Sequence, residues 1–320
     1  MKRIFAFVVL LTVLIGVFSS AVVAQDSTQA SASVTIAVVT PYLAQPGTQF
    51  EVEAFQKAAE ANGWTVNVID TAGDMAAVNS RVQDVITQKV SAIVINSDPS
   101  QIPALKDAVA AKIPVFGLDA GSAPEVMVNV TSNGYEMAAT TASYVIDRLN
   151  GKGNIVMFGF NAYPPVQKRG VVAKSIFDNT PDIKILDFVE PDVTDGGIAD
   201  SRAKMEAILT ANPNPGDIAA VWAAWDQPAL GALQAIQAAG RDKEGIIITG
   251  MDANPQALDA ISQKGNFEAS IAQDFSGMGA QVAAQIQRYL NGETLTQHTV
   301  YTPTKLVTAS NVADFMPKSS

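Results

Sequence analysis

The feature that most constrains the fold is an alternation that runs along the chain from Val34 onward. Short runs rich in Val and Ile alternate with longer stretches that carry apolar residues at helical spacing. This pattern is typical of repeated βα units, in which helices bury both faces of a parallel sheet. The sequence therefore predicts an α/β fold built on parallel sheets.

The predicted strands form two groups of four. The first group comprises residues 34–40, 65–69, 92–96 and 115–118, and the second comprises residues 154–158, 183–189, 219–223 and 245–249. Helices are predicted at 50–61, 76–88 and 135–149, and the first and third stop at Asn-Gly pairs. A strand at 269–272, a helix at 279–290 and a last extended stretch after Tyr301 are expected to complete the two halves.

Residues 1–24 predict a secretory signal peptide. Lys2 and Arg3 precede an apolar run at 4–18, and small residues ending at Ala24 follow. A membrane anchor is the alternative, but the run is short and no second one follows it. We therefore expect cleavage after residue 24, a flexible leader at 25–33 rich in Ser, Thr, Gln and Ala, and a soluble periplasmic or otherwise extracytoplasmic protein.

Composition excludes several classes of site and partner. The chain has no cysteine, so disulfides, thiolate metal sites, thiol nucleophiles and a lipid-attachment cysteine are excluded. The formal net charge is −10, and loss of Lys2 and Arg3 makes it more negative, which argues against nucleic acid or anionic lipid as a partner. About 290 residues remain after cleavage, enough for two lobes with separate cores and a cleft between them.

Four aspartates follow the carboxyl ends of predicted strands: Asp98, Asp119, Asp226 and Asp252. Ligands bind at that edge of parallel sheets, and two of these carboxylates lie in each half, so facing lobes would direct them into one crevice. Carboxylates suit a hydroxyl-rich solute because each accepts several hydrogen bonds. The alternative for each is capping of the next helix, which prolines favour after Asp98 and Asp226. Asp119 and Asp252 are the stronger ligand candidates, and Asp226 is retained as a weaker one.

Two aromatic residues are candidates for the same crevice. Trp225 and Tyr42 fall at predicted strand ends, and a sugar ring packs its C–H face on such side chains. For Tyr42, packing within the protein is an equal alternative. Trp222 lies inside a predicted strand, so we expect it in the core.

Six segments together resemble one known family. They are residues 36–39 (IAVV) leading to Pro46, 58–64 (AAEANGW), 113–119 (IPVFGLD), 229–236 (ALGALQAI), 250–252 (GMD) and 270–273 (SIAQ). They resemble the ribose-binding type of periplasmic binding protein, whose fold is shared with the ligand domains of LacI-type regulators. The resemblance covers essentially the whole chain after the signal peptide.

The resemblance implies a type I periplasmic binding protein, with two Rossmann-like lobes joined by a three-crossing hinge near 131–133, 273–274 and 303–304. The first lobe would comprise residues 34–132 plus 274–302, and the second 133–273 plus 303–320. Such a protein closes on a sugar or polyol and delivers it to the permease of an ABC importer. The family expectation is a monomer.

The resemblance also assigns ligand residues by position. Asp119, Asp252 and Gln273 match residues that bind ligand hydroxyls, and Gln45 falls where a polar contact residue is usual.

The chain departs from the family pattern at four places. Ala120 and Gln167 stand where ligand arginines are expected, Gly47-Thr48 replaces an aromatic pair, and Trp225 replaces a ligand-contacting asparagine. By position, Gln167, Thr48 and Trp225 are ligand candidates as well. A pocket with fewer guanidinium groups donates fewer hydrogen bonds to the oxygens of a sugar ring, and an added aromatic ring offers more surface for stacking. Ribose is therefore not expected. A linear or modified polyol, a deoxy sugar and a small compound with an amine facing the carboxylates all remain compatible.

Two rival functions are weighed against transport. A secreted enzyme acting on carbohydrate in the same cleft is disfavoured, because His298 lies in a polar stretch and no nucleophile elbow, phosphate loop or metal-ligand cluster accompanies it. Carboxylate pairs alone still permit acid–base chemistry. The other rival is a chemosensory role, which one chain can combine with transport. A DNA-binding regulator is disfavoured, because a signal peptide stands where its headpiece would be.

Overall fold

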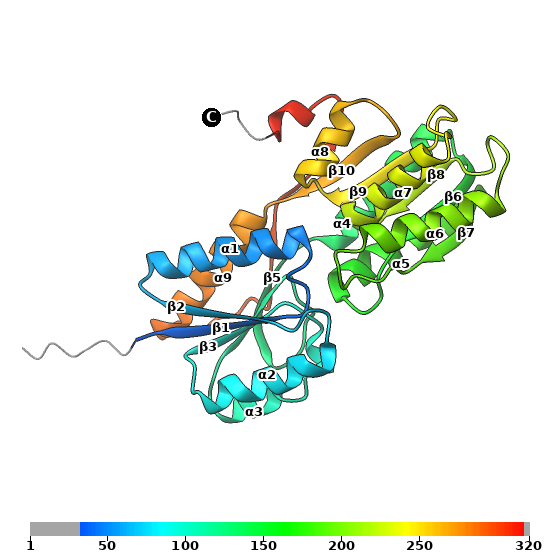
Figure 1. The fold of residues 1–320 in the computed structure, drawn as a ribbon. Helices are drawn as coiled ribbons and strands as arrows, with labels where there is room; N and C mark the ends of the chain where they lie inside the picture. Colours follow the sequence, from blue (N-terminus) through cyan, green and yellow to red (C-terminus); the bar gives the residue numbers. More distant parts are fainter. Residues whose placement is uncertain (1–32, 317–320) are drawn as a thin grey trace, which may run out of the picture. The chain divides into compact units, whose positions relative to one another are not determined.

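The βα alternation produces two six-stranded sheets, each covered by helices on both faces (Figure 1). The computed structural model describes residues 33–316. The predicted signal peptide, residues 25–32 of the predicted leader and residues 317–320 lie outside the described residues. The predicted α/β fold with two lobes is confirmed, and each six-stranded sheet has two strands in addition to the four of its predicted group.

The first sheet is parallel throughout, in the order β11-β5-β4-β3-β1-β2. Its strands are β1 (Thr35–Thr40), β2 (Thr65–Asp70), β3 (Ala92–Ile95), β4 (Val115–Leu118), β5 (Val126–Ser132) and β11 (Thr299–Thr302). Its helices are α1 (Pro46–Ala61), α2 (Met75–Thr87), the 3-10 turn η1 (Pro99–Gln101), α3 (Leu105–Ala110) and α9 (Phe275–Leu290). One core cluster packs α1 and α9 on one face through Phe55 and Val282, and another packs α2 and α3 on the other through Val82 and Leu105.

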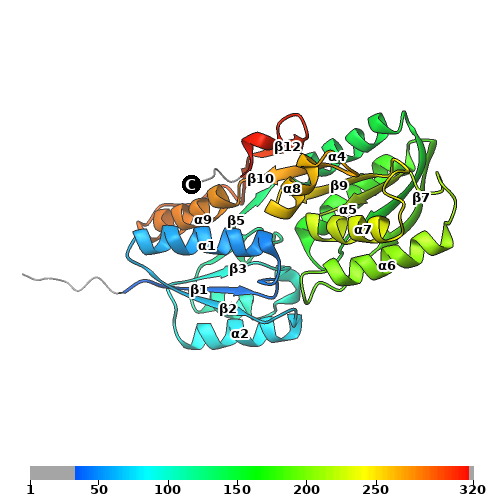
Figure 2. The same cartoon turned by 45° about the horizontal axis from the view of Figure 1, so that its top comes forward.

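The second sheet has the order β12-β10-β9-β8-β6-β7 and is parallel except for the edge strand β12. Its strands are β6 (Lys152–Phe158), β7 (Asp182–Val189), β8 (Ala220–Ala223), β9 (Ile247–Asp252), β10 (Phe267–Gln273) and β12 (Thr304–Thr308). Its helices are α4 (Gly134–Arg148), α5 (Pro164–Asp178), α6 (Ile198–Ala211), α7 (Asp226–Ala238), α8 (Pro255–Ser262) and the 3-10 turn η2 (Val312–Asp314). Clusters around Trp222 and Phe158 fill its two faces, and Figure 2 shows α6 and α7 side by side.

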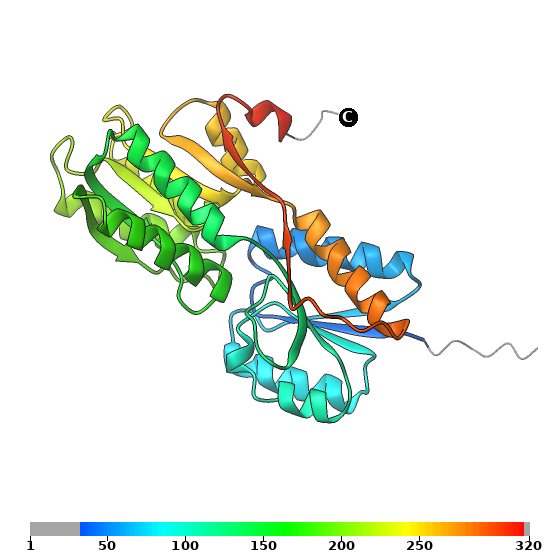
Figure 3. The same ribbon diagram turned by 180° about the vertical axis from the view of Figure 1, so that it is seen from behind.

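The chain passes between the sheets three times, which is visible from behind in Figure 3. The passages follow the last residues of β5, β10 and β11: the chain leaves β5 for α4, leaves β10 for α9, and leaves β11 for β12. Each passage has a single residue between the two elements. Both lobes are therefore assembled from separate parts of the chain.

Most element positions agree with the sequence prediction within a few residues, but β5 was missed. This strand contains Asn129, a polar residue at a buried position. Asn129 is tolerated because its side-chain amide bonds the backbone of Ala120 in the preceding loop. A buried asparagine interrupts the apolar run by which a strand is recognised from sequence.

One glycine in each lobe lets two helices approach closely. A Cβ on Gly279 of α9 would lie 2.6 Å from the carbonyl oxygen of Glu51 in α1, and a Cβ on Gly231 of α7 would lie 2.5 Å from the carbonyl oxygen of Ile198 in α6. Because backbone atoms cannot move aside as a flexible side chain does, any side chain would separate the helices. The segment containing Gly231 is one of those that carry the family resemblance.

Among residues 33–316, no helix combines the length and apolar character needed to cross a bilayer.

We predict that Gly279→Ala and Gly231→Ala each lower the free energy of unfolding by about 1–3 kcal/mol, because the added methyl overpacks a helix interface. Urea unfolding followed by circular dichroism measures the change. Gly265→Ala is the matched control, because a Cβ there meets no heavy atom within 4 Å. Equal stability of all three variants and the wild type would contradict the close packing.

Candidate functional site

In the first sheet, Asp119 is positioned by a glycine and a buried asparagine. A Cβ on Gly117 of β4 would clash with the side chain of Asn129. Because that space is open, the Asn129 side chain accepts a hydrogen bond from the Ala120 N–H at 3.0 Å and donates one to the Ala120 carbonyl at 2.7 Å. These two bonds hold the loop that carries Asp119.

In the second sheet, Gly250 of β9 makes room in the same way for Asp226, with which a Cβ would clash. Asp226 accepts hydrogen bonds from the Asn254 N–H at 2.8 Å and from the Ser270 hydroxyl at 2.7 Å. Ser270 in turn accepts from the Ala253 N–H at 3.0 Å. The loop that follows Asp252 is therefore fixed from both sides.

Asp119 and Asp252 also share an uncommon backbone conformation. Their φ angles are 47° and 109°, and such positive values are costly for residues other than glycine. Asparagine and aspartate tolerate them better than bulkier residues do. Strained positions of this kind cluster at functional sites when the surrounding structure holds them in place.

The two aspartates line one cavity between the lobes. It leaves about 60 Å³ of space for the centres of water molecules, and it is partly open to solvent. The first lobe contributes Tyr42, Gln45, Gly47, Thr48, Glu51, Asp119 and Phe275. The second lobe contributes Phe160, Tyr163, Val166, Arg169, Val193, Trp225, Asp252 and Gln273.

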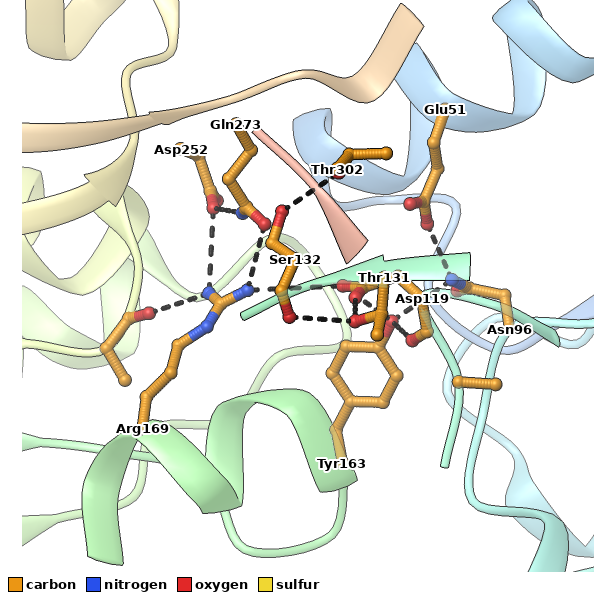
Figure 4. A network of polar contacts seen from close by, with 12 residues as sticks. Glu51, Asn96, Asp119, Thr131, Ser132, Tyr163, Arg169, Asp252, Gln273 and Thr302 are labelled. Atoms are coloured by element: carbon orange, nitrogen blue, oxygen red, sulfur yellow. Dashed lines mark hydrogen bonds and ion pairs between the residues drawn. The ribbon is translucent and has the colours of Figure 1, made fainter. Parts of the chain in front are cut away.

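Arg169 of α5 lies between the two aspartates and is only 2% exposed (Figure 4). Its Nη1 donates to the Ala224 carbonyl at 3.0 Å and lies 3.7 Å from Asp252 Oδ1. Its Nη2 donates to Gln273 Oε1 at 3.3 Å and lies 4.0 Å from Asp119 Oδ2. One buried guanidinium therefore bridges carboxylates of both lobes. The sequence predicted a cavity short of guanidinium groups, and Arg169 corrects that expectation.

A second set of bonds joins the lobes at Tyr163, which precedes α5 (Figure 4). Its hydroxyl donates to the Asp119 carbonyl and accepts from Asn96 Nδ2 at 3.1 Å. The Thr131 hydroxyl donates to the Asp119 carboxylate. Asp119 is thus held by groups from its own lobe and from the opposite one.

The loop before α1 contributes further polar and aromatic contacts. Gln45 Nε2 donates to the Val193 carbonyl of the opposite lobe at 3.0 Å. Thr48 lines the cavity from the first turn of α1. A Cβ on Gly47 would lie 3.1 Å from the ring of Phe275, so Phe275 supplies an aromatic wall beside the position where the family has its aromatic pair.

Trp225 and Tyr42 belong to a connected aromatic wall. Phe160 packs edge-on against both, with ring centroids 6.2 Å from Tyr42 and 6.4 Å from Trp225. Trp225 Nε1 is buried without a hydrogen-bond partner among the described residues, whereas the Tyr42 hydroxyl contacts Met75 Sδ at 3.7 Å. Burial raises the pKa of Tyr42 to about 12. Tyr42 therefore packs in the protein and also faces the cavity. Trp222 is buried in the core, as predicted.

The structure does not bring two of the candidate residues to the cavity. Gln167 is exposed on α5, and Arg169, two residues further, faces inward instead. Asp226 is fully buried behind the cavity wall, where its oxygens accept from Asn254 in the loop after Asp252 and from Ser270 of β10 rather than from its own helix. Asp98 caps η1 by accepting from the Ser100 N–H, which confirms the capping alternative for that residue. His298 is exposed, as expected.

Sequence reasoning missed Glu51, Tyr163, Phe160 and Phe275, and it used Arg169 only as a landmark. Glu51 lies on the buried face of α1 among apolar neighbours, and a charged residue at a core position is the signal that would have found it. Among the described residues, no group of three or more His, Cys, Asp and Glu is placed to hold a metal ion.

Burial dominates the electrostatics of the cavity. It raises the pKa of Asp252 to about 7, against the opposing effect of Arg169 and the hydrogen bond from Gln273. Burial, with Asp119 and Asp252 nearby, also raises the pKa of Glu51 well above its usual value. Folding is therefore less favourable when these carboxyl groups are ionised than when they are protonated.

We predict that stability without solute falls as the pH rises from about 4 to above 7. A raised carboxyl pKa means that the folded state binds the proton more tightly than the unfolded state does. The resulting stabilisation is complete below the pKa of the unfolded state and is lost as the pH rises through the pKa of the folded state. For Asp252 the loss reaches about 4 kcal/mol at pH 7.

Asp252→Asn should therefore flatten the dependence of unfolding free energy on pH and be more stable than the wild type at pH 8. Urea unfolding from pH 4 to 8 measures both slopes. Identical slopes would show that Asp252 carries no such penalty.

Comparison with known proteins places this arrangement in a family. A model of the periplasmic binding protein domain matches residues 36–294. The ribose import binding protein of Bacillus subtilis is 32% identical over 80% of this chain and 81% of that protein. A putative rhizopine-binding protein of Rhizobium meliloti is 27% identical over 82% and 85%.

Solved structures agree with these sequence matches. An ABC transporter solute binding protein from Agrobacterium vitis with bound allitol has a TM-score of 0.83 and 28% identity, covering 88% of this chain and 98% of its own. Its fold, like that of the present chain, has two α/β lobes with mainly parallel sheets. The chain belongs to the periplasmic binding protein family.

Proposed function

We propose that this protein is the extracytoplasmic solute-binding component of an ABC importer and captures a sugar or polyol between its lobes. The observation that carries the proposal is the convergence of Asp119 and Asp252, from strand ends of different sheets, on one cavity that Arg169 also lines. Carboxylates and a guanidinium together bind vicinal hydroxyls, which both donate and accept hydrogen bonds. Relatives named for ribose import and for bound allitol support this solute class.

The proposed ligand-binding residues are those candidates that line the cavity. They are Asp119, Asp252, Gln273, Trp225, Tyr42, Gln45 and Thr48, to which Arg169 is added. Trp225 offers an apolar ring face for the solute, and its free Nε1 offers a hydrogen-bond donor. The polar groups fix the orientation of the solute, and the aromatic wall excludes water around it.

Capture proceeds by hinge closure in this proposal. The lobes, 34–132 plus 274–302 and 133–273 plus 303–320, move about the three passages of the chain, and solute stabilises the form in which both contact it. Hydrogen bonds such as those of Gln45 to Val193 and of Tyr163 to Asp119 join the lobes across the cavity and stabilise the closed form. The permease then recognises surfaces that closure brings into register. The protein acts as a monomer with no cofactor, metal or nucleic acid.

The proposal assigns no catalysis to the cavity. His298, the one histidine of the chain, is exposed and is not among the residues that line it. The two aspartates serve as acceptors for hydroxyl groups, and Arg169 between them offsets part of their charge.

A thermal-shift panel of sugars, polyols and amino sugars should identify a ligand. Saturation at about 100 times the dissociation constant stabilises the protein by roughly 2.7 kcal/mol, enough for a clear shift in Tm. The ligand should be recovered unchanged by mass spectrometry after long incubation. Absence of any shift across the panel would contradict the proposed solute class, and a converted product would establish turnover.

With that ligand, Asp119→Ala should raise Kd about 100-fold, corresponding to about 3 kcal/mol, because a buried donor on the solute loses its charged acceptor. Asp98→Ala is the matched control: it also removes an aspartate at a strand end, but this one caps η1 and does not line the cavity. Calorimetry measures both variants. Equal losses of affinity in the two variants would refute the specific role of Asp119.

A further inference from the structure

Glu51 is a buried carboxyl group with one oxygen left unpaired. It lies on α1, is 1% exposed and lines the cavity. Its Oε1 accepts from Asn96 Nδ2 at 2.6 Å, while its Oε2 is buried and has no hydrogen-bond partner among the described residues. Its neighbours Val52 and Phe55 belong to the apolar core. A half-satisfied carboxyl at such a position is costly unless another molecule supplies the missing donor.

The residues that line the cavity also carry an excess of acidic groups. Glu51, Asp119 and Asp252 are three carboxyls, and Arg169 is the one cationic side chain among the lining residues. Arg169 is within ion-pair distance of Asp252 and Asp119, so Glu51 has no cation of its own. Lys168, next along α5, lies over the ring of Tyr135 instead.

The walls of the cavity favour a positive charge as well. Five aromatic rings line it: Tyr42, Phe160, Tyr163, Trp225 and Phe275. The faces of such rings attract cations, most strongly where water is excluded. Gln45 Oε1, Trp225 Nε1 and Arg169 Nε are also buried and unpaired, and they offer both acceptors and donors to hydroxyl groups.

We propose that the cavity takes a small polyhydroxylated solute carrying one protonated amine, such as an amino sugar or aminocyclitol, and that Glu51 selects the amine. The inference rests on the proposed function and narrows its solute class. An ammonium has three donors, which fits the free Oε2 of Glu51 together with oxygens of the nearby carboxylates.

The protonation of Glu51 separates this solute from a neutral one. The charged groups that affect Glu51 are Asp119 from the loop after β4, Asp252 from β9 and Arg169 from α5, and Asn96 bonds it directly. Burial and the two aspartates raise the pKa of Glu51, which favours the protonated acid while no cation is bound. Binding of an ammonium therefore releases a proton. A neutral polyol leaves that proton in place and accepts a hydrogen bond from it.

The test is calorimetric titration of the wild-type protein, freed of solute, with three matched pairs. The pairs are myo-inositol and a monoamino-inositol, glucitol and glucamine, and glucose and glucosamine. Titration in two buffers of different ionisation enthalpy counts the protons released. In at least one pair the amine should bind about tenfold tighter or better, with net proton release, and its affinity should fall as the pH is lowered.

Glu51→Gln keeps the size of the side chain and removes its charge, so the amine and its neutral partner should bind this variant with similar affinity. Glu53→Gln is the matched control, because it removes the same charge from an exposed position on the same helix. The proton count and the pH series on the wild type test the inference even if Glu51→Gln fails to fold.

Three results would overturn the inference. Neutral compounds that bind as tightly as their amines in every pair that binds would do so, as would an amine preference that survives in Glu51→Gln. A neutral ligand from the wider panel, with none of the three amines bound, would also overturn it, and the proposed function would then stand. Failure of the whole panel would instead remove the proposed function itself.

Discussion

The structure depends on a buried guanidinium held between carboxylates of two lobes. Arg169 is within 4.0 Å of both Asp119 and Asp252, and almost no part of these three side chains reaches solvent. Burying charges is unfavourable unless they are paired and hydrogen-bonded, and breaking such a set leaves an uncompensated charge. Arg169 balances only part of the negative charge, since Glu51 lines the same cavity. The unbalanced negative charge therefore destabilises the cavity without solute. A solute that supplies hydrogen-bond donors lowers the free energy of the site on binding.

The geometry of that cluster is determined by residues that do not line the cavity. Gly117 with Asn129, and Gly250 with Asp226, fix the loops that carry the two aspartates, one pair in each sheet. Both loops adopt a positive φ at the aspartate, a conformation that persists because these bonds over-determine it. Asp226 thus contributes to the site by position, although the structure does not place it in the cavity. In both lobes a glycine and a buried polar side chain fix the loop, but the polar side chain is an asparagine in one lobe and an aspartate in the other.

Much of the fold could be predicted because it follows from apolar periodicity. Strands such as Ala92–Ile95 are short Val- and Ile-rich runs, and their carboxyl ends indicate where a ligand site lies. The prediction failed where a buried polar residue interrupts the pattern, as Asn129 does in β5. The six-stranded sheets also depend on β11 and β12, which join their sheets from the end of the chain, and such non-local pairing has no local signal.

The site could be predicted only in part. Strand-end aspartates and a strand-end tryptophan are visible in sequence, and seven of the nine candidates line the cavity in the structure. Side-chain direction on a helix is less visible: the resemblance placed a ligand position at Gln167, whereas Arg169, two residues further along α5, faces the cavity. Phe275 and Glu51 were missed because each reaches the cavity from a helix whose role looks structural in the sequence. The cavity is thus built as much by helix starts as by strand ends.

The central claim is that carboxylates of both lobes and the guanidinium between them hold one solute. The most direct measurement is a crystal structure of the protein with its bound solute. It should show the solute in the cavity, within hydrogen-bond distance of Asp119, Arg169 and Asp252 and beside the ring of Trp225. Solute bound elsewhere, for example in the groove that Phe50 and Phe315 line between α1 and the C-terminal segment, would contradict the claim.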